Sequence, residues 1–313
     1  ETTTFTATLS ATSSEIVTVN LTLGGTAKED IDLTTTFSSK ESISTFFNES
    51  NLGLVSIFFD SSDNLFINAG STVKKLASGG ASTTVFGNNL SSSYGGIFVD
   101  SSGNVFVADT NNNRIMKYTS SDSNGTVVAG GNGAGSATNQ LSGSVSGIWL
   151  DSDSNIYIAD TGNHRVMKWD SGASSGTVIA GGNGIGQGTN QFYNPQGIAL
   201  DNSNNMYVSD LRRIQKIPLG STTATTTHTY SYPAEMFHLN SQNGHIYLAQ
   251  KENHRIRKIN GITGNQTLYA GGNGGGSNSN QFNLPRDITA DSKGNLYIAD
   301  TNNNRIQKIQ LSP

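Results

Sequence analysis

The sequence predicts an all-β protein: a six-bladed β-propeller closed by an N-terminal strand and preceded by a short β-rich arm. One pattern of short strands and turns recurs six times, at a spacing of about 40 to 50 residues that is typical of propeller blades. The strands are rich in Val, Ile, Phe, Tyr and Trp, and clusters of Asp, Ser, Asn and Gly separate them. No apolar segment keeps a helical period for three turns, so helix is expected to be negligible.

Three copies of the pattern are nearly the same sequence. They read GIFVDSSGNVFVADTNNNRIMKY, GIWLDSDSNIYIADTGNHRVMKW and DITADSKGNLYIADTNNNRIQKI, and they end at Tyr118, Trp169 and Ile309. Weaker copies end at Ile217 and Ile259, and the most divergent copy ends at Leu76. Each copy has one turn residue at the same place: Asp60, Asp100, Asp151, Asp201, Asn240 and Asp291.

Each copy predicts the strands of one blade. In the copy that ends at Tyr118, the apolar runs predict strands at residues 96–100, 104–109 and 114–118, followed by a fourth strand that begins at Thr126. Fourth strands are likewise expected to begin at Thr83, Thr177, Thr225 and Thr267. The last copy stops after its third strand, and residues 42–47, SISTFF, match the missing strand in length and character. Pairing them with the last blade would close the ring and remove its exposed edges, so we expect the propeller to span residues 42–313.

The first 41 residues do not repeat. TTFTATLS, EIVTVNLTLGG and DIDLTTTFSS alternate small polar and apolar residues at period two, which predicts three further strands in an arm over residues 1–41. Three strands cannot bury a sandwich core on their own. We therefore expect another surface to complete the arm, either the flank of the propeller or a neighbouring chain by strand addition.

Composition excludes several kinds of partner. The net charge is -4 and only 13% of residues are charged, so the chain lacks the basic field that attracts nucleic acid. The apolar runs are far shorter than the roughly 20 residues needed to span a bilayer, so no membrane insertion is expected. Low charge and abundant Ser, Thr, Asn and Gly favour an extracellular or cell-surface protein. In that setting five sequons are candidate N-glycosylation sites: Asn20, Asn48, Asn89, Asn124 and Asn265.

The stretch IADTGNHRVMKWD places Asp160, His164 and Arg165 close together, as an active site would. Comparison between copies favours a structural role, because a catalytic group is needed once and not in most blades. The acid recurs as Asp109, Asp210 and Asp300, and the cation recurs as Arg114, Arg213, Arg255 and Arg305. We expect the Asp carboxylate to accept backbone N–H bonds of the Asn-rich turn and to pair with the Arg that begins the next strand.

Other motifs also favour architecture over chemistry. The AGGNG motifs at 130–133, 181–184 and 271–274 lack the following helix of a phosphate-binding loop, so they are expected to link blades through glycines with positive φ. His228, His238 and His245 have no metal-ligand spacing, and no serine lies in a nucleophile elbow. No catalytic residue, cofactor or metal is therefore predicted. Basic residues recur once per blade and would form a ring, either solubilising the surface or binding an acidic or glycan partner.

Segments of the sequence resemble two known families. The pattern D-S-x-G-N-x-Y-I-A-D-T-x-N-x-R-I-x-K-I, followed by AGGNG, NQF and a proline, resembles the NHL repeat. NHL propellers act mainly as binding platforms, and some related six-bladed propellers are metal-dependent lyases or lactonases, so the resemblance implies fold more firmly than activity. VTVNLTLGGTAKEDIDLTT resembles the later half of a Calx-β domain. Such domains can bind calcium, which leaves calcium open as a ligand of the arm at Glu29, Asp30 and Asp32.

These observations predict a non-enzymatic extracellular structural or interaction protein. The propeller would be a rigid body, and the arm would mediate self-assembly into a homo-oligomer or polymer, including fibres, by strand addition. One alternative is a ligand-binding or sensor propeller within a longer surface protein, with recognition at one rim. Another is a metal-dependent lyase or hydrolase, which needs histidines and carboxylates converging on the central channel.

Overall fold

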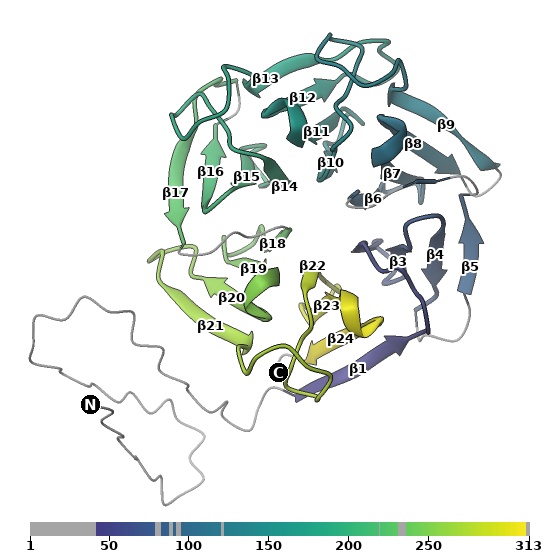
Figure 1. Ribbon diagram of the computed structural model, residues 1–313, viewed down its shortest axis with the longest axis vertical. Helices are drawn as coiled ribbons and strands as arrows, with labels where there is room; N and C mark the ends of the chain where they lie inside the picture. Colours follow the sequence, from purple (N-terminus) through teal and green to yellow (C-terminus); the bar gives the residue numbers. More distant parts are fainter. Residues whose placement is uncertain are drawn as a thin grey trace, which may run out of the picture. The chain divides into compact units, whose positions relative to one another are not determined.

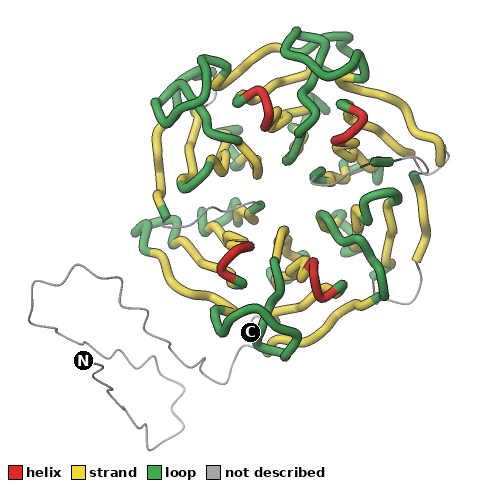
Figure 2. Tube along the Cα trace, in the orientation of Figure 1, coloured by secondary structure: helices red, strands yellow, loops and turns green. Residues whose placement is uncertain are grey.

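Six four-stranded antiparallel sheets surround a common centre as the blades of a propeller (Figure 1). The computed structural model describes residues 42–78, 83–87, 90–91, 95–119, 122–218, 220–230 and 236–310. Helix in these residues is confined to four short 3₁₀ turns, drawn in red in Figure 2. The prediction of an all-β six-bladed propeller is confirmed. The predicted arm of residues 1–41, including its candidate calcium ligands, lies outside the described residues.

The strands follow the repeats of the sequence. Blade 1 contains β2–β5 (Ser56–Phe59, Leu65–Asn68, Val73–Leu76, Thr83–Phe86), blade 2 β6–β9 (Ile97–Val99, Val105–Asp109, Arg114–Thr119, Asp122–Gly130) and blade 3 β10–β13 (Ile148–Leu150, Ile156–Asp160, Arg165–Trp169, Thr177–Gly181). Blade 4 contains β14–β17 (Pro195–Leu200, Met206–Asp210, Arg213–Ile217, Thr225–Thr229) and blade 5 β18–β21 (Phe237–Leu239, Ile246–Gln250, Arg255–Ile259, Gln266–Gly271). Blade 6 contains β22–β24 (Pro285–Ala290, Leu296–Asp300, Arg305–Gln310) and β1 (Ser42–Asn48). The 3₁₀ turns are η1–η4 (Thr110–Asn112, Thr161–Asn163, Lys251–Asn253, Thr301–Asn303).

Blade 6 takes its strands from both ends of the described chain. Its order is β1–β24–β23–β22, and β1 pairs antiparallel with β24, from Ser42 opposite Gln310 to Asn48 opposite Arg305. The register shifts between Thr45 and Phe47, where the strand has a bulge or irregularity. The outermost strand of the last blade therefore precedes blade 1 in the sequence (Figure 1).

Aspartates shape the turn between the first two strands of most blades. In blade 2, Asp100 Oδ1 accepts hydrogen bonds from the backbone N–H groups of Ser102 and Asn104, at 2.9 and 2.8 Å. Its Oδ2 accepts a third bond from the Asn104 side chain at 2.7 Å. The same three bonds recur around four other turn residues: Asp60, Asp151, Asp201 and Asp291. These turn acids are thus engaged by their own loops.

The hydrophobic core consists of six clusters, each between two neighbouring blades. The cluster between blades 6 and 1, for example, packs Ile57 and Ile67 against Tyr297 and Ile306. Burying one large apolar side chain stabilises the fold by about 2 kcal/mol, so every blade is held from both sides. No helix in the described part of the chain is long and apolar enough to cross a membrane.

Glycines bring the innermost strands close together. Gly147 N donates a 2.8 Å hydrogen bond to Gln196 O of the next blade, and a Cβ on Gly147 would lie 2.4 Å from that oxygen. Blade 6 has Asp287 at this position. Its Oδ2 accepts bonds from Ser56 Oγ and Ile57 N of blade 1, at 2.5 and 2.9 Å. A carboxylate thus joins the innermost strands of blades 6 and 1, whereas glycine backbone bonds from Gly96 and Gly147 join blades 2 to 3 and 3 to 4.

Candidate functional site

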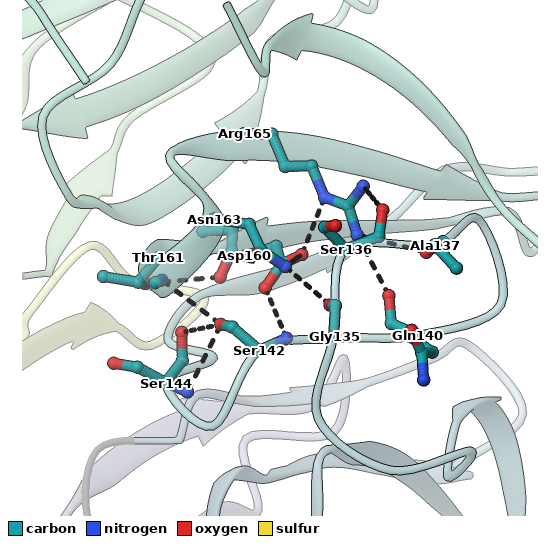
Figure 3. A network of polar contacts seen from close by, with 12 residues as sticks. Gly135, Ser136, Ala137, Gln140, Ser142, Ser144, Asp160, Thr161, Asn163 and Arg165 are labelled. Carbon is teal, nitrogen blue, oxygen red and sulfur yellow. Dashed lines mark hydrogen bonds and ion pairs between the residues drawn. The ribbon is translucent and has the colours of Figure 1, made fainter. Parts of the chain in front are cut away.

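The Asp160 and Arg165 side chains form part of a polar network that fixes a loop between blades (Figure 3). Asp160 is fully buried, and its Oδ2 lies 2.8 Å from Arg165 Nε and 2.8 Å from Asn163 Nδ2. Its Oδ1 accepts the backbone N–H of Ser142 at 2.9 Å. The guanidinium of Arg165 donates to three backbone carbonyls of the incoming loop: Ser136, Ala137 and Gln140. These contacts satisfy the buried charge pair with hydrogen bonds from and to the loop.

The same arrangement recurs around the ring. The Asp–Arg pairs of blades 2, 4 and 6 are Asp109 with Arg114, Asp210 with Arg213, and Asp300 with Arg305. In blade 5, Arg255 Nε donates to Gln250 Oε1 at 2.8 Å, because an amide replaces the acid. The backbone donors differ from our expectation: they are Ser91, Ser142, Tyr193 and Asn283 of the loops between blades, whereas the Asn-rich turn contributes side-chain donors.

His164 and His254 also belong to these corners. Both have positive φ, 54° and 53°, in the left-handed region that ends the preceding 3₁₀ turn. Each Nδ1 accepts a backbone N–H of the following loop between blades, from Asn194 at 3.3 Å and from Leu284 at 3.2 Å. The histidine next to Asp160 therefore contacts the following loop between blades through its Nδ1.

The candidate glycosylation sites divide into two groups. Asn48, Asn124 and Asn265 are exposed. Asn20 and Asn89 lie outside the described residues. Exposure makes the first three accessible to modification.

One cross-strand row of side chains runs outward through every blade. The strand registers pair a residue of the innermost strand with an aromatic residue of the second strand and a lysine of the third. The rows are Phe58, Phe66 and Lys75; Phe98, Phe106 and Lys117; Trp149, Tyr157 and Lys168; Ala199, Tyr207 and Lys216; His238, Tyr247 and Lys258; Thr289, Tyr297 and Lys308.

The outer part of each row explains the recurring basic residues. Every lysine Nζ lies between 5.1 and 6.0 Å from the centroid of its aromatic neighbour. Several of these lysines also form ion pairs with carboxylates. Lys216 Nζ, for example, lies 3.5 Å from Asp201 Oδ2. The lysines thus cover the aromatic rings of the blades, and their charge is partly balanced.

The inner end of each row is where the blades differ. Four of these variable residues, Phe58, Trp149, His238 and Thr289, line a cavity of about 150 Å³ at the centre of the ring. A second hollow of about 380 Å³ lies at the turns of blades 3 to 5 and shares Trp149 and Leu239 with the first. The sequence signal for these positions was available: each residue lies two places before the turn Asp or Asn of its repeat. Sequence reasoning missed them because it looked for what the copies share.

Aromatic rings form one wall of the central cavity, which we call the channel. The ring centroids of Phe58 and Phe98 are 4.7 Å apart, those of Phe98 and Trp149 are 5.2 Å apart, and those of Phe58 and Trp149 are 6.3 Å apart. The three rings are inclined to one another and remain partly exposed. Phe58 and Trp149 therefore present aromatic rings to the cavity, and Phe98 of the blade between them packs against both.

Blades 5 and 6 contribute His238, Thr289 and Asp287 to the lining, and blade 1 contributes Ser56, whose hydroxyl is bonded to Asp287. Burial lowers the pKa of His238 to about 4, although the channel leaves its side chain partly accessible. The imidazole is therefore neutral at pH 7, with one nitrogen as donor and one as acceptor. Thr289 adds a hydroxyl. Asp287 also lines the cavity, but its Oδ2 accepts the two bonds from blade 1.

The described residues contain no group of three or more His, Cys, Asp or Glu side chains arranged to hold a metal ion. Of the described residues that line the central cavity, His238 and Asp287 are the ionisable ones. The arrangement can offer hydrogen bonds and an aromatic surface to a ligand.

Comparison with known proteins agrees with the fold. The NHL repeat family profile matches residues 282–309, which extend from the end of the last loop between blades through most of β24. The Arabidopsis thaliana protein SUPPRESSOR OF QUENCHING 1, chloroplastic, is 24% identical over 254 residues, which cover 66% of this chain. The chain spans about a quarter of the length of that relative.

Solved structures with the same fold include binding proteins and enzymes. An auxiliary nutrient binding protein from Bacteroides thetaiotaomicron has a TM-score of 0.67 at 16% identity and covers 92% of this chain and 79% of its own. A streptogramin B lyase has a TM-score of 0.61 at 13% identity, covering 87% and 98%. A gluconolactonase from Xanthomonas campestris has a TM-score of 0.62 at 12% identity, covering 88% and 95%. Similarity at these identities concerns the fold alone.

Proposed function

We propose that this chain is a non-enzymatic extracellular binding protein whose propeller recognises a neutral sugar unit in the central channel. The observation that carries the proposal is the difference between the two sides of the channel. Phe58 and Trp149 supply an aromatic wall, while His238 and Thr289 supply neutral hydrogen-bonding groups. A sugar ring has the same two characters, because its C–H face is apolar and its hydroxyls donate and accept hydrogen bonds.

Electrostatics favour an uncharged ligand. His238 is neutral at pH 7 because its pKa is about 4, and Asp287 Oδ2 is engaged by Ser56 and Ile57. An anionic ligand would lose its hydration in this cavity with no cationic side chain among the described lining residues, and a cationic ligand would have to compete with the hydrogen bonds that Ser56, Ile57 and Ile288 donate to Asp287. Hydrogen bonds to a neutral ligand avoid that cost.

The size of the channel suits a single sugar unit of a larger glycan. The central cavity of about 150 Å³ is below the usual range for drug-sized ligands, and the hollow of about 380 Å³ beside it lies at the turn rim. One unit would occupy the cavity, and the rest of the glycan would extend past Trp149 to the rim. One solved structure with the same fold is described as an auxiliary nutrient binding protein, which supports the proposal of a binding role.

The test is ligand-observed NMR, followed by calorimetry, with methyl glycosides of glucose, galactose and mannose. We expect at least one glycoside to bind the wild type, with a tenfold or greater loss in Trp149→Leu and a smaller loss in Thr289→Val. Ile185→Ala is the matched control, because Ile185 is 51% exposed on a loop outside the channel. Absence of binding by all three glycosides, or equal affinity in the wild type and Trp149→Leu, would refute the proposal.

Self-assembly through the arm remains a prediction from the sequence of residues 1–41.

A further inference from the structure

A second pocket of about 290 Å³ lies between blades 3 and 4, away from the channel. Its walls come from Val178 and Ile179 of blade 3 and from Met206, Ile217 and Pro218 of blade 4. None of its lining residues lines the central cavity. The two sites therefore have separate walls.

The pocket exists because two facing positions are both aliphatic. Between blades 2 and 3, Trp169 of the third strand packs in the same cluster as Val128 of the outermost strand. In blade 4 the position of Trp169 is taken by Ile217. Trp169 pairs with Ile156 at the start of the second strand of blade 3, and Ile217 pairs with Met206 at the start of the second strand of blade 4.

At the junction between blades 5 and 6, the aromatic residue lies on the outermost strand of the first blade and not on the third strand of the second. There the third strand carries the aliphatic residue Ile309, as blade 4 carries Ile217, and the outermost strand of blade 5 carries Tyr269 in the cluster. Ile179 holds the position of Tyr269 in blade 3, one residue before the alanine of the outermost strand. Ile179 and Ile217 together leave a volume that an aromatic ring fills at each of these other two junctions.

A cation lies at the edge of this apolar pocket. Lys168 contributes to the lining, and its Nζ lies 2.8 Å from Asp170 Oδ1, a carboxylate whose side chain is 70% exposed. Its Nζ is 6.0 Å from the Tyr157 ring, the longest of the six lysine–aromatic distances. An ammonium has three donors, and an exposed ion pair is worth less than about 1 kcal/mol, so Lys168 can bind another carboxylate.

We propose that the pocket between blades 3 and 4 binds a small aromatic carboxylic acid. The ring would take the place between Ile179 and Ile217 that corresponds to Trp169 between blades 2 and 3 and to Tyr269 between blades 5 and 6, and the carboxylate would pair with Lys168. Burial of the ring supplies affinity, and the ion pair at the rim supplies selection for an acid.

The test uses 3-phenylpropionate and its neutral analogue 3-phenylpropionamide, measured by ligand-observed NMR and calorimetry. We expect the wild type to bind the acid more tightly than the amide. Lys168→Gln should weaken the acid at least fivefold and leave the amide unchanged, whereas Asp170→Asn should strengthen the acid by removing a competing carboxylate. Ile179→Tyr and Ile217→Trp should abolish binding of both, because they place a ring in the pocket. Lys216→Gln, at the same position of the next blade, is the matched control and should change nothing.

Three results would overturn the proposal: no binding of the acid by the wild type, equal affinity of acid and amide in the wild type, or full acid binding in either ring-insertion variant. Ile179 is partly exposed, so Ile179→Tyr decides the question if Ile217→Trp does not fold. Channel binding of glycosides should be unaffected by all five variants, which keeps this proposal independent of the function proposed above.

Discussion

Replacing His238 with Phe is expected to make the stability of the propeller less dependent on pH between about 7 and 4. His238 lines the channel, and burial lowers its pKa from 6.5 to about 4. Blades 1 and 2 carry Phe58 and Phe98 at the same position, so a phenyl ring suits this part of the fold. The substitution removes one titrating group and leaves the row of side chains in place.

The sign and magnitude follow from the two pKa values. The folded state holds His238 neutral, whereas the unfolded chain protonates it as pH falls below 6.5. The contribution to stability is therefore complete above pH 6.5 and is lost as pH falls towards 4. The difference between the two pKa values corresponds to about 3 kcal/mol. The His238 side chain is partly exposed, so we expect about 2 kcal/mol in practice.

The assay is urea unfolding of the wild type and the variant at pH 7, 6, 5 and 4, with refolding curves to establish reversibility. The wild type should lose about 2 kcal/mol more than His238→Phe across this range. An NMR titration of the imidazole in the wild type gives the folded pKa directly. A measured pKa of 6 or above, or parallel pH profiles of the two proteins, would refute the argument that burial controls this group.

Three further outcomes are expected. Asp160→Ala should destabilise the protein by about 3 to 5 kcal/mol in thermal or urea unfolding, since it leaves the buried Arg165 without its carboxylate; a loss below 1 kcal/mol would contradict this. Gly147→Ala should cost about 1 to 3 kcal/mol because its Cβ meets a backbone carbonyl at 2.4 Å, whereas Gly143→Ala meets nothing closer than 3.6 Å and should be nearly neutral. Deleting residues 1–41 should reduce particle size in light scattering if the arm mediates assembly; an unchanged size would rule the arm out.

Much of the propeller could be predicted from the sequence because its information is local and repeated. The turn acids such as Asp100 bond residues two and four places along the chain, so the turn follows from a few adjacent residues. The alternation of apolar residues likewise follows from the pleat of each strand. The Asp and Arg of IADTGNHRVMKWD recur in sister copies, and on the same ground this recurrence favours a structural role for the pair.

The hydrogen-bond partners of these side chains could not be predicted from local sequence in the same way. Asp160 accepts its backbone bond from Ser142, 18 residues earlier, and Arg165 reaches carbonyls up to 29 residues earlier. Such contacts depend on how a loop returns to the next blade. Asp287 was not singled out at all, since its partners Ser56 and Ile57 lie at the far end of the propeller sequence.

The sequence by itself thus determined the all-β class and the six blades, because each copy encodes its own strands and turns. Only the tertiary structure decided where Phe58, Trp149, His238 and Thr289 converge, and where Ile179 and Ile217 together leave a pocket. The physical reason is that a repeat specifies its own blade, whereas a binding site on a propeller is built from the residues in which different blades differ.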